Sequence, residues 1–156
     1  MNIAIGADHR GFALKVELMA ALAAEGHAVE DVGASAIDPA DDYPDYAYPV
    51  ALLVSSGEAE RGILACGSGT GMAIAANKVA GIRAVEGSSE AHVRAARCDD
   101  DVNVLALSAD ELSPGDALAI ARAFLAEPFK GGERYERRLD EIAEMEHDGR
   151  DEASHD

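Results

Sequence analysis

The stretch GILACGSGTGMAIAANK at residues 62–78 decides the fold. It opens with a short apolar run, 62–66, that is typical of a buried strand, and it closes with small residues that favour a helix over 72–78. Between the two lies a turn with three alternating glycines, Gly67, Gly69 and Gly71. A strand that leads through a glycine-rich turn into a helix is a unit from which parallel sheets are built.

The same alternation of short apolar runs and stretches of helical period extends along the chain. Further strands are predicted at 2–6, 28–32, 82–85 and 103–107. Further helices are predicted at 12–26, 47–56, 89–97, 114–125 and 133–146. The core-facing stripe expected in the first of these helices consists of Phe12, Val16, Met19 and Leu22. Ser113 and Asp116 resemble a capping box at the start of the helix that begins at Pro114.

This pattern predicts one α/β domain with a Rossmann-like, doubly wound, five-stranded parallel sheet and helices on both faces. We assign the domain to residues 1–147. The segment 148–156 is acidic and is expected to form a disordered tail. A chain of 156 residues, 48% of them hydrophobic, is long enough to bury a core without help from metals or disulfides.

The formal net charge of −17 argues against nucleic acid as a partner, because duplex binding requires a cationic surface. An anionic ligand must therefore be held by local positive groups. A membrane partner is not expected, since no stretch approaches the roughly 20 apolar residues of a span. The N-terminus does not resemble a secretory signal, and two cysteines, Cys66 and Cys98, make no disulfide framework. We therefore expect a cytoplasmic location.

The loops that follow the strands are the expected ligand site, because ligands of open parallel sheets bind beyond the carboxyl ends of the strands. Asp8 and His9 follow the first strand, and the glycine turn follows the third. Backbone N–H groups in such a turn can hold an oxyanion or a phosphate. The glycine spacing matches neither the dinucleotide-binding pattern nor the Walker loop, so a tight turn without a ligand explains it equally well.

Cys66 stands at the end of a predicted strand and just before a helix N-terminus. Helix dipole and backbone amides favour a thiolate in that setting, which can act as a nucleophile or a general base. A lone cysteine is more often a small buried hydrophobe. Its position directly before the glycine turn favours a functional role for Cys66, whereas Cys98 has no such setting.

Two other polar pairs are candidates with simpler alternatives. His9 could bind an anion or relay a proton, and Asp8 could accept a hydrogen bond from a hydroxyl, although such a pair is more often a solvated turn. Arg134 and Arg138 lie four residues apart on the last helix and could hold a phosphate together. Solubilising surface charge explains the two arginines more simply.

Taken together, these segments resemble the family that contains ribose-5-phosphate isomerase B and the galactose-6-phosphate isomerase subunits. The segment that carries the resemblance most specifically is CGSGTG, at 66–71, running into AANK. The other matching stretches are IAIGADHRGFALK from Ile3, DYPDYA at 42–47, NVLAL at 103–107 and FKGGERYERR at 129–138.

The resemblance implies aldose–ketose isomerisation of a sugar phosphate without a metal or nucleotide cofactor, in a homodimer whose active sites are shared across the interface. Pairing of dimers into a tetramer stays open. By position, Cys66 would be the base that moves a proton between C1 and C2. The groups that would stabilise the enediolate are Ser68 and the N–H groups of Gly67, Gly69 and Gly71. The groups that would bind substrate hydroxyls or phosphate are Asp8, His9, Tyr43, Arg134 and Arg138.

The chain departs from the family pattern at three places. A His-Asn pair assigned to opening the sugar ring falls on Asp99 and Asp100, so Asp99 is the candidate for ring opening and Asp100 for substrate binding. An arginine that often follows the fifth strand falls on Asp110, and a Cys or His near the end of the fourth strand falls on Glu86-Gly87. These changes add acid near the expected pocket.

The leading functional prediction is an isomerase that interconverts ribose 5-phosphate and ribulose 5-phosphate. The departures leave open a related isomerase of a tetrose, allose or galactose phosphate. A non-catalytic Rossmann-like module that binds a sugar phosphate is the alternative from another class. Cys66 discriminates between the classes, because a binding module does not need a thiol before the glycine turn.

Overall fold

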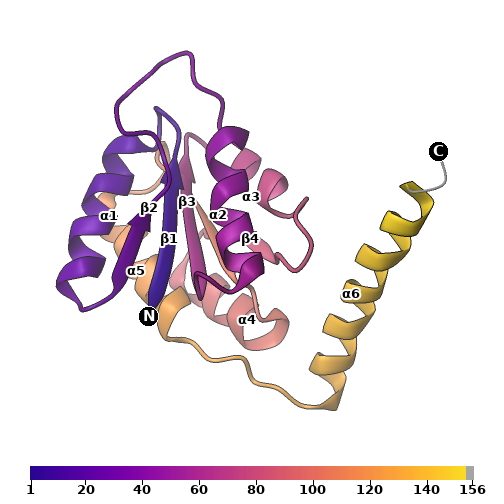
Figure 1. The fold of residues 1–156 in the computed structure, drawn as a ribbon. Helices are drawn as coiled ribbons and strands as arrows, with labels where there is room; N and C mark the ends of the chain where they lie inside the picture. The colour runs from indigo at the N-terminus through magenta and orange to yellow at the C-terminus, as the bar shows by residue number, and fades with distance from the viewer. Residues whose placement is uncertain (154–156) are drawn as a thin grey trace.

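The computed structural model describes the backbone of residues 1–153 and the side chains of residues 1–148. At its centre lies a five-stranded sheet in the order β2-β1-β3-β5-β4 (Figure 1), with all neighbouring strands parallel. The strands are β1 (Asn2–Ala7), β2 (Ala28–Asp31), β3 (Arg61–Cys66), β4 (Ala84–Glu86) and β5 (Val104–Ser108). The predicted fold class is confirmed.

Helices cover both faces of the sheet (Figure 1). One face packs against α1 (Phe12–Ala24), α4 (Glu90–Asp100) and α5 (Pro114–Ala126), and the other against α2 (Pro44–Ser56) and α3 (Thr70–Ala76). Successive residues of a strand point to opposite faces, so Ile63 of β3 lies in the first core and Leu64 in the second. Cys66 shares the face of Leu64 and is therefore on the α2–α3 side.

The order of the strands creates a switch point between β1 and β3. After β1 the chain turns to one side of the sheet and forms α1 and β2, whereas after β3 it crosses to the other face and forms α3. Loops that leave neighbouring strands in opposite directions open a crevice at the carboxyl edge, where ligands of such sheets bind. Both the Asp8–His9 loop and the glycine turn lie at this point.

The last helix, α6 (Glu133–Ala153), extends away from the layers of the domain (Figure 1). It contacts the domain through Glu146, whose carboxylate accepts a hydrogen bond from the Gly81 N–H at 2.9 Å. The helix is longer than predicted and runs into the segment expected to be a disordered tail. A single interior glycine such as Gly149 costs a helix only about 1 kcal/mol, so it does not end it. Residues 154–156 of that tail lie outside the described residues.

The predicted core stripe of α1 is wrong in part. Leu14, Leu18 and Leu22 are buried, whereas Val16 is 49% exposed. Alanines and leucines occupy several faces of this helix, so the helical period alone does not single out the buried one. The predicted cap of α5 is confirmed, since the Ser113 hydroxyl accepts a hydrogen bond from the Asp116 N–H at 3.1 Å.

Two helix boundaries differ from prediction in ways that concern the site. Helix α2 begins at Pro44, because proline suits the first position of a helix, where its missing N–H is not needed. Helix α4 continues to Asp100, so Asp99 and Asp100 belong to its last turn rather than to a loop. Within residues 1–153, no helix is both long enough and apolar enough to span a bilayer.

Candidate active site

Loops from four parts of the chain meet at the carboxyl edge of β1 and β3. The glycine turn is joined to the loop after β5 by hydrogen bonds from the Ala109 N–H to the Cys66 carbonyl, at 2.9 Å, and from the Asp110 N–H to the Gly67 carbonyl, at 3.1 Å. Arg10 lies over Gly67 and Tyr43 lies over Gly71. Side chains from separate loops therefore surround the turn.

Cys66 is buried at the end of β3, with 4% of its surface exposed. The Gly69 N–H donates to its Sγ at 3.2 Å. A backbone donor aimed at sulfur interacts more strongly with a thiolate than with a neutral thiol. Gly69 has φ +81° and its N–H reaches back to the sulfur because the turn is left-handed there, a conformation that glycine adopts without strain.

The rest of the glycine turn is closely covered. The Ser68 hydroxyl is exposed and accepts a hydrogen bond from the Thr70 N–H at 3.3 Å. A β-carbon at Gly71 would stand 2.7 Å from Tyr43 Cζ, and one at Gly67 would overlap the Arg10 guanidinium. The close approach of these two side chains therefore requires glycines in the turn.

Asp8 and His9 play different parts in the loop after β1. Asp8 is 5% exposed, and its Oδ1 accepts hydrogen bonds from the N–H groups of Arg10 and Gly11, both at 3.0 Å. His9 Nδ1 lies 2.5 Å from Asp41 Oδ1, and the same oxygen accepts from the His9 backbone N–H at 3.2 Å. Asp8 thus shapes the turn, while His9 is paired with a carboxylate from the loop before α2.

Asp8, His9 and Asp41 each offer a possible metal-ligand atom, and these atoms lie within 4.8 Å of one another. Two ligand atoms that share one zinc ion at about 2.1 Å stand roughly 3.4 Å apart in tetrahedral geometry. The 2.5 Å contact between His9 and Asp41 is shorter and has the length of a hydrogen bond. The arrangement therefore fits a hydrogen-bonded pair better than a metal centre.

Burial and hydrogen bonding act in opposite directions on this pair's carboxylate. Burial raises the pKa of Asp41, but hydrogen bonds from His9 and an interaction with the Tyr46 hydroxyl outweigh it, so the net shift is downward. Burial and the nearby Asp41 charge together raise the pKa of Tyr46. Asp41 is therefore held as a carboxylate next to a neutral phenol.

Two of the acidic departures from the family pattern, Asp110 and Glu86, have side-chain partners in the structure. Arg10 Nη2 donates to Asp110 Oδ2, so Asp110 adds no unpaired negative charge beside the turn. Glu86 Oε2 accepts from the Thr70 hydroxyl at 2.8 Å. Sequence reasoning missed Asp41 and the position of Arg10 over Gly67. The adjacency of Arg10 to His9 was a usable signal, whereas nothing local ties Asp41 to His9.

The remaining predicted site residues lie at the opposite edge. Helix α4 runs antiparallel to the strands, so its last turn, with Asp99 and Asp100, is at the amino edge of the sheet. The chain leading to α6 passes beside it, since the Lys130 N–H donates to the Cys98 carbonyl at 3.0 Å. Arg134 and Arg138 are exposed on the first turns of α6. One chain therefore does not bring these four residues to Cys66.

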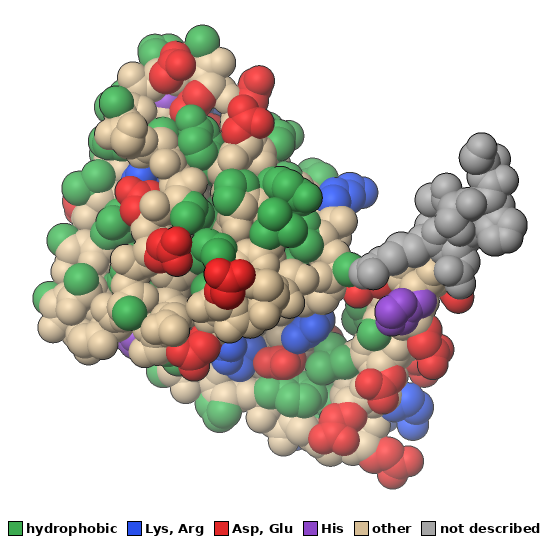
Figure 2. Space-filling model, viewed as in Figure 1, with side chains coloured by type: hydrophobic (Ala, Val, Ile, Leu, Met, Phe, Trp, Pro, Cys, Tyr) green, Lys and Arg blue, Asp and Glu red, His purple; other side chains and the backbone are tan. Residues whose placement is uncertain are grey.

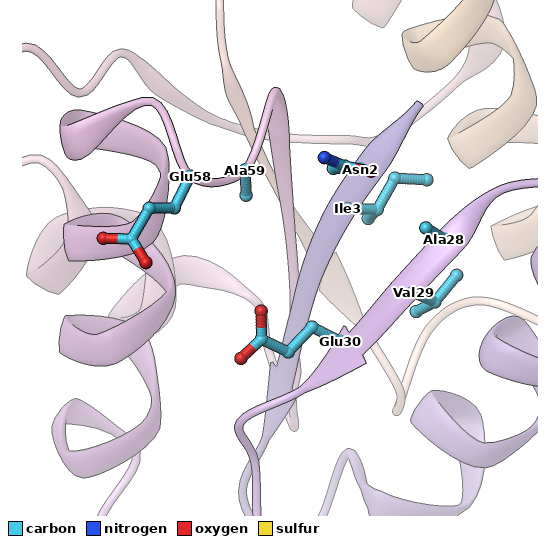
Figure 3. A pocket seen from close by; sticks show the side chains of 7 residues that line it. All are labelled: Asn2, Ile3, Ala28, Val29, Glu30, Glu58 and Ala59. Atoms are coloured by element: carbon cyan, nitrogen blue, oxygen red, sulfur yellow. The ribbon is translucent and has the colours of Figure 1, made fainter.

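A surface hollow of 330 Å³ lies near the amino ends of β1 and β2 (Figure 3). Its lining consists of Asn2, Ile3, Ala28, Val29, Glu30, Glu58 and Ala59. Two carboxylates and a lining without a cation or nucleophile suit neither an anionic ligand nor proton transfer. We therefore place the candidate site at the carboxyl edge and not in this hollow.

Known proteins match this chain over nearly its whole length. The sequence pattern of the ribose/galactose isomerase family matches residues 3–142. Ribose-5-phosphate isomerase B of Escherichia coli is 43% identical over 145 residues, which cover 93% of this chain and 96% of that protein.

Two solved structures are similar to this chain over nearly its whole length. Ribose-5-phosphate isomerase B of Clostridium thermocellum superposes with a TM-score of 0.91 at 41% identity, covering 95% of this chain and 99% of that one. The Mycoplasma genitalium enzyme of the same name, with bound ribulose 5-phosphate, gives a TM-score of 0.90 at 39% identity, covering 94% of this chain and 96% of that one.

Proposed function

We propose that this chain, which belongs to the ribose/galactose isomerase family and is a sugar-phosphate isomerase, interconverts ribose 5-phosphate and ribulose 5-phosphate with Cys66 as the base. The observation that carries the proposal is the contact of 3.2 Å between the Gly69 N–H and Cys66 Sγ at the β1–β3 switch point. It combines a thiol, a preformed N–H donor and a buried strand end at the place where such sheets bind ligands.

The reaction needs a base and a site for negative charge, because a proton next to a carbonyl is only weakly acidic. In the proposed mechanism the Cys66 thiolate takes the proton from C2 of the aldose. The enediolate that forms lies against the N–H groups of the turn and the Ser68 hydroxyl. The same sulfur then returns the proton to C1 while a second proton passes from the C2 hydroxyl to the oxygen on C1, which yields the ketose with no net change in the enzyme.

The phosphate of the substrate requires cations. Among residues 1–148, the Cys66 edge of one chain provides no unpaired cation, since Arg10 is held by Asp110. We further propose that a second copy of the chain completes the site with Arg134 and Arg138, and with Asp99 and Asp100 from its α4. In a two-fold dimer each of two sites would then combine one chain's carboxyl edge with the other chain's amino edge.

Exposed apolar side chains support an association of two copies. Tyr48 and Leu52 of α2 and Ile74 of α3 are 58%, 44% and 57% exposed, and hydrophobic side chains gather over these helices in Figure 2. On α6, Ile142 and Met145 are 41% and 69% exposed. Apolar surface grouped in this way is typical of a protein–protein contact.

The substrate proposal is tested by measuring turnover of ribose 5-phosphate beside tetrose, allose and galactose phosphates. Ribose 5-phosphate is expected to give the highest kcat/KM. Preference for another sugar phosphate would keep the isomerase assignment and replace the substrate. Tight binding of a sugar phosphate with no turnover of any would instead support a binding module.

The shared site is tested by mixing two impaired variants. Cys66→Ala and Arg138→Ala chains, unfolded and refolded together, should form mixed dimers with one intact site. Random pairing restores about a quarter of the wild-type sites, which is measured at low substrate concentration. A mixture that is no more active than the sum of its parts would show that each site is built from a single chain.

A further inference from the structure

We propose that Asp41 is a positioning residue that acts through His9, and that the pair moves a proton between two oxygens of the substrate. Asp41 would fix the orientation and tautomer of the imidazole, and His9 Nε2 would exchange the proton. The inference rests on the proposed isomerase function and adds the acid–base group that Cys66 alone does not supply.

The chemistry calls for such a group. Conversion of an aldose to a ketose moves one proton from C2 to C1 and a second from the C2 hydroxyl to the oxygen on C1. If Cys66 carries the first, another group has to carry the second. A neutral imidazole can accept the proton from the hydroxyl at O2, become an imidazolium, and donate the proton to O1, so that the enzyme ends unchanged.

The geometry fixes the imidazole in the state that this step requires. Asp41 Oδ1 accepts from both the ring and the backbone N–H of His9, at 2.5 and 3.2 Å, which sets the ring's orientation. A carboxylate can only accept, so the ring proton lies on Nδ1 and Nε2 carries the lone pair. Within residues 1–148, no group forms a hydrogen bond with Nε2. The His9 side chain is 27% exposed, so a ligand can reach it.

The burial of Asp41 indicates more than an exposed loop contact. Its side chain is 6% exposed, and its Oδ2 is buried with no partner that meets hydrogen-bond geometry among the described residues. An unsatisfied buried oxygen lowers the stability of the fold, so its retention calls for an explanation. Hydrogen bonds from His9 nevertheless lower the pKa of Asp41, and the carboxylate that they keep charged stabilises the imidazolium that forms when His9 takes a proton.

The pair also belongs to the two loops whose side chains cover the glycine turn. His9 directly precedes Arg10, whose guanidinium covers Gly67, the residue after Cys66. Asp41 comes from the loop that also carries Tyr43, which covers Gly71 at the other end of the glycine turn. The loop that holds the carboxylate therefore also lies over the turn that is proposed to hold the enediolate.

A purely structural role for Asp41, as a tie between the loop before α2 and β1, makes different predictions. The test compares Asp41→Asn, His9→Gln and the double variant. The matched control is Asp45→Asn, which removes the same charge from an exposed position nearby. His9→Gln should lower kcat about 10²-fold with little change in KM, and Asp41→Asn should lower it at least tenfold. Adding Asp41→Asn to His9→Gln should cost nothing further, because the carboxylate acts only through the ring.

The ring nitrogens give a readout that does not depend on activity. In protein labelled with ¹⁵N-histidine, the His9 signals should report a proton on Nδ1 in the wild type and in Asp45→Asn, and a mixture of tautomers in Asp41→Asn. Asp41→Glu keeps the carboxylate and should keep the wild-type tautomer, so it serves as the second variant if Asp41→Asn is unstable.

The outcomes separate the two proposals. If the wild type is active, two results overturn the role of Asp41. One is a wild-type kcat in Asp41→Asn, and the other is additive losses of kcat in the double variant. An unchanged tautomer in Asp41→Asn overturns it as well. A wild type that turns over no sugar phosphate, while the His9 signals change as described, would instead defeat the proposed function and leave only the hydrogen-bonded pair.

Discussion

At the carboxyl edge of the sheet, the polar groups around Cys66 come from separate loops and are paired one to one, whereas at the amino edge the charges form a partly buried network beside exposed residues. Arg97 is 2% exposed and donates to Asp101 Oδ1 at 2.6 Å and to the Val102 carbonyl at 2.7 Å. Arg83 donates to the other oxygen of Asp101 at 3.1 Å. This network fixes the turn after α4.

The difference between the two edges of the sheet suits them to different roles, proton transfer at one and substrate binding at the other. The carboxyl edge has a thiol, a donor to its sulfur and a histidine, which are the groups that proton transfer needs. The amino edge has exposed arginines on α6 and carboxylates in the last turn of α4, held in place by Asp101 at φ 46°. Neither edge is sufficient alone for a phosphorylated sugar, which is why we propose that two copies combine them.

Removal of the thiol should have the largest effect on this comparison. Cys66→Ala should keep the fold and lower kcat by about 10²–10⁴-fold, the usual contribution of a general base. Iodoacetamide should inactivate the wild type, and substrate should protect it. Cys98→Ala is the matched control and should be fully active. A folded, active Cys66→Ala protein would end the assignment of the base.

Replacement of the exposed arginines of α6 should have the next largest effect. Arg134→Ala or Arg138→Ala should raise KM for a sugar phosphate, and weaken inhibition by inorganic phosphate, by about 10- to 100-fold, because each loses a charge-assisted hydrogen bond of roughly 1.5–3 kcal/mol. Arg137→Ala is the control, since Arg137 is an exposed neighbour 3.9 Å from Glu141. Unchanged Michaelis constants in both variants would return the two arginines to the role of surface charge.

Asp99 tests whether the amino edge takes part in ring opening. A pentose 5-phosphate closes into a furanose and must be opened, whereas a tetrose 4-phosphate cannot form that ring because its O4 carries the phosphate. An imidazole titrates near neutral pH and donates a proton more readily than an ionised carboxylate. Asp99→His should therefore speed pentose turnover severalfold and leave tetrose turnover nearly unchanged. Equal slowing of both substrates would assign Asp99 another role.

The smallest effect is expected from the pair of Arg10 and Asp110. Both side chains are about half exposed, so the pair contributes little to stability. Asp110→Asn should release Arg10 toward an anionic substrate and lower KM about two- to fivefold, in keeping with an exposed ion pair of up to 1 kcal/mol. Glu111→Gln, which makes the same change of charge at the adjacent residue, should change KM less. A raised KM in Asp110→Asn would mean that Asp110 positions Arg10 for binding.

Local sequence signals predicted the parts of the molecule that depend on neighbours in the chain. The alternation of strand and helix, the glycine turn and the Ser113 cap follow from short-range preferences, and they also placed Cys66 at a strand end. The buried face of α1 could not be predicted in the same way, because Val16 and Leu18 are equally apolar and only packing against the sheet distinguishes them.

At the candidate site, too, the contacts that the sequence could not predict depend on tertiary packing. The pairing of His9 with Asp41 spans a loop whose path is set by tertiary contacts, and the Arg10–Asp110 pair joins the loops that follow the first and fifth strands. The order of residues indicates that Asp99 precedes a strand. Its place at the amino edge of the sheet follows from helix α4, which extends to Asp100. Which residues meet across two copies is beyond what the order of residues in one chain can specify.

The covered glycine turn has a consequence for how this protein can be altered by mutation. Gly69 is fixed by its left-handed backbone and by the Leu107 backbone 3.0 Å from where a β-carbon would stand, so no change elsewhere readily makes room there. At Gly67 and Gly71 the nearest obstacles are the Arg10 and Tyr43 side chains, which can be made smaller. Larger residues at 67 or 71 would be accessible in pairs, through a smaller partner at 10 or 43, and such paired replacements offer a route to a differently shaped pocket around an unchanged Cys66.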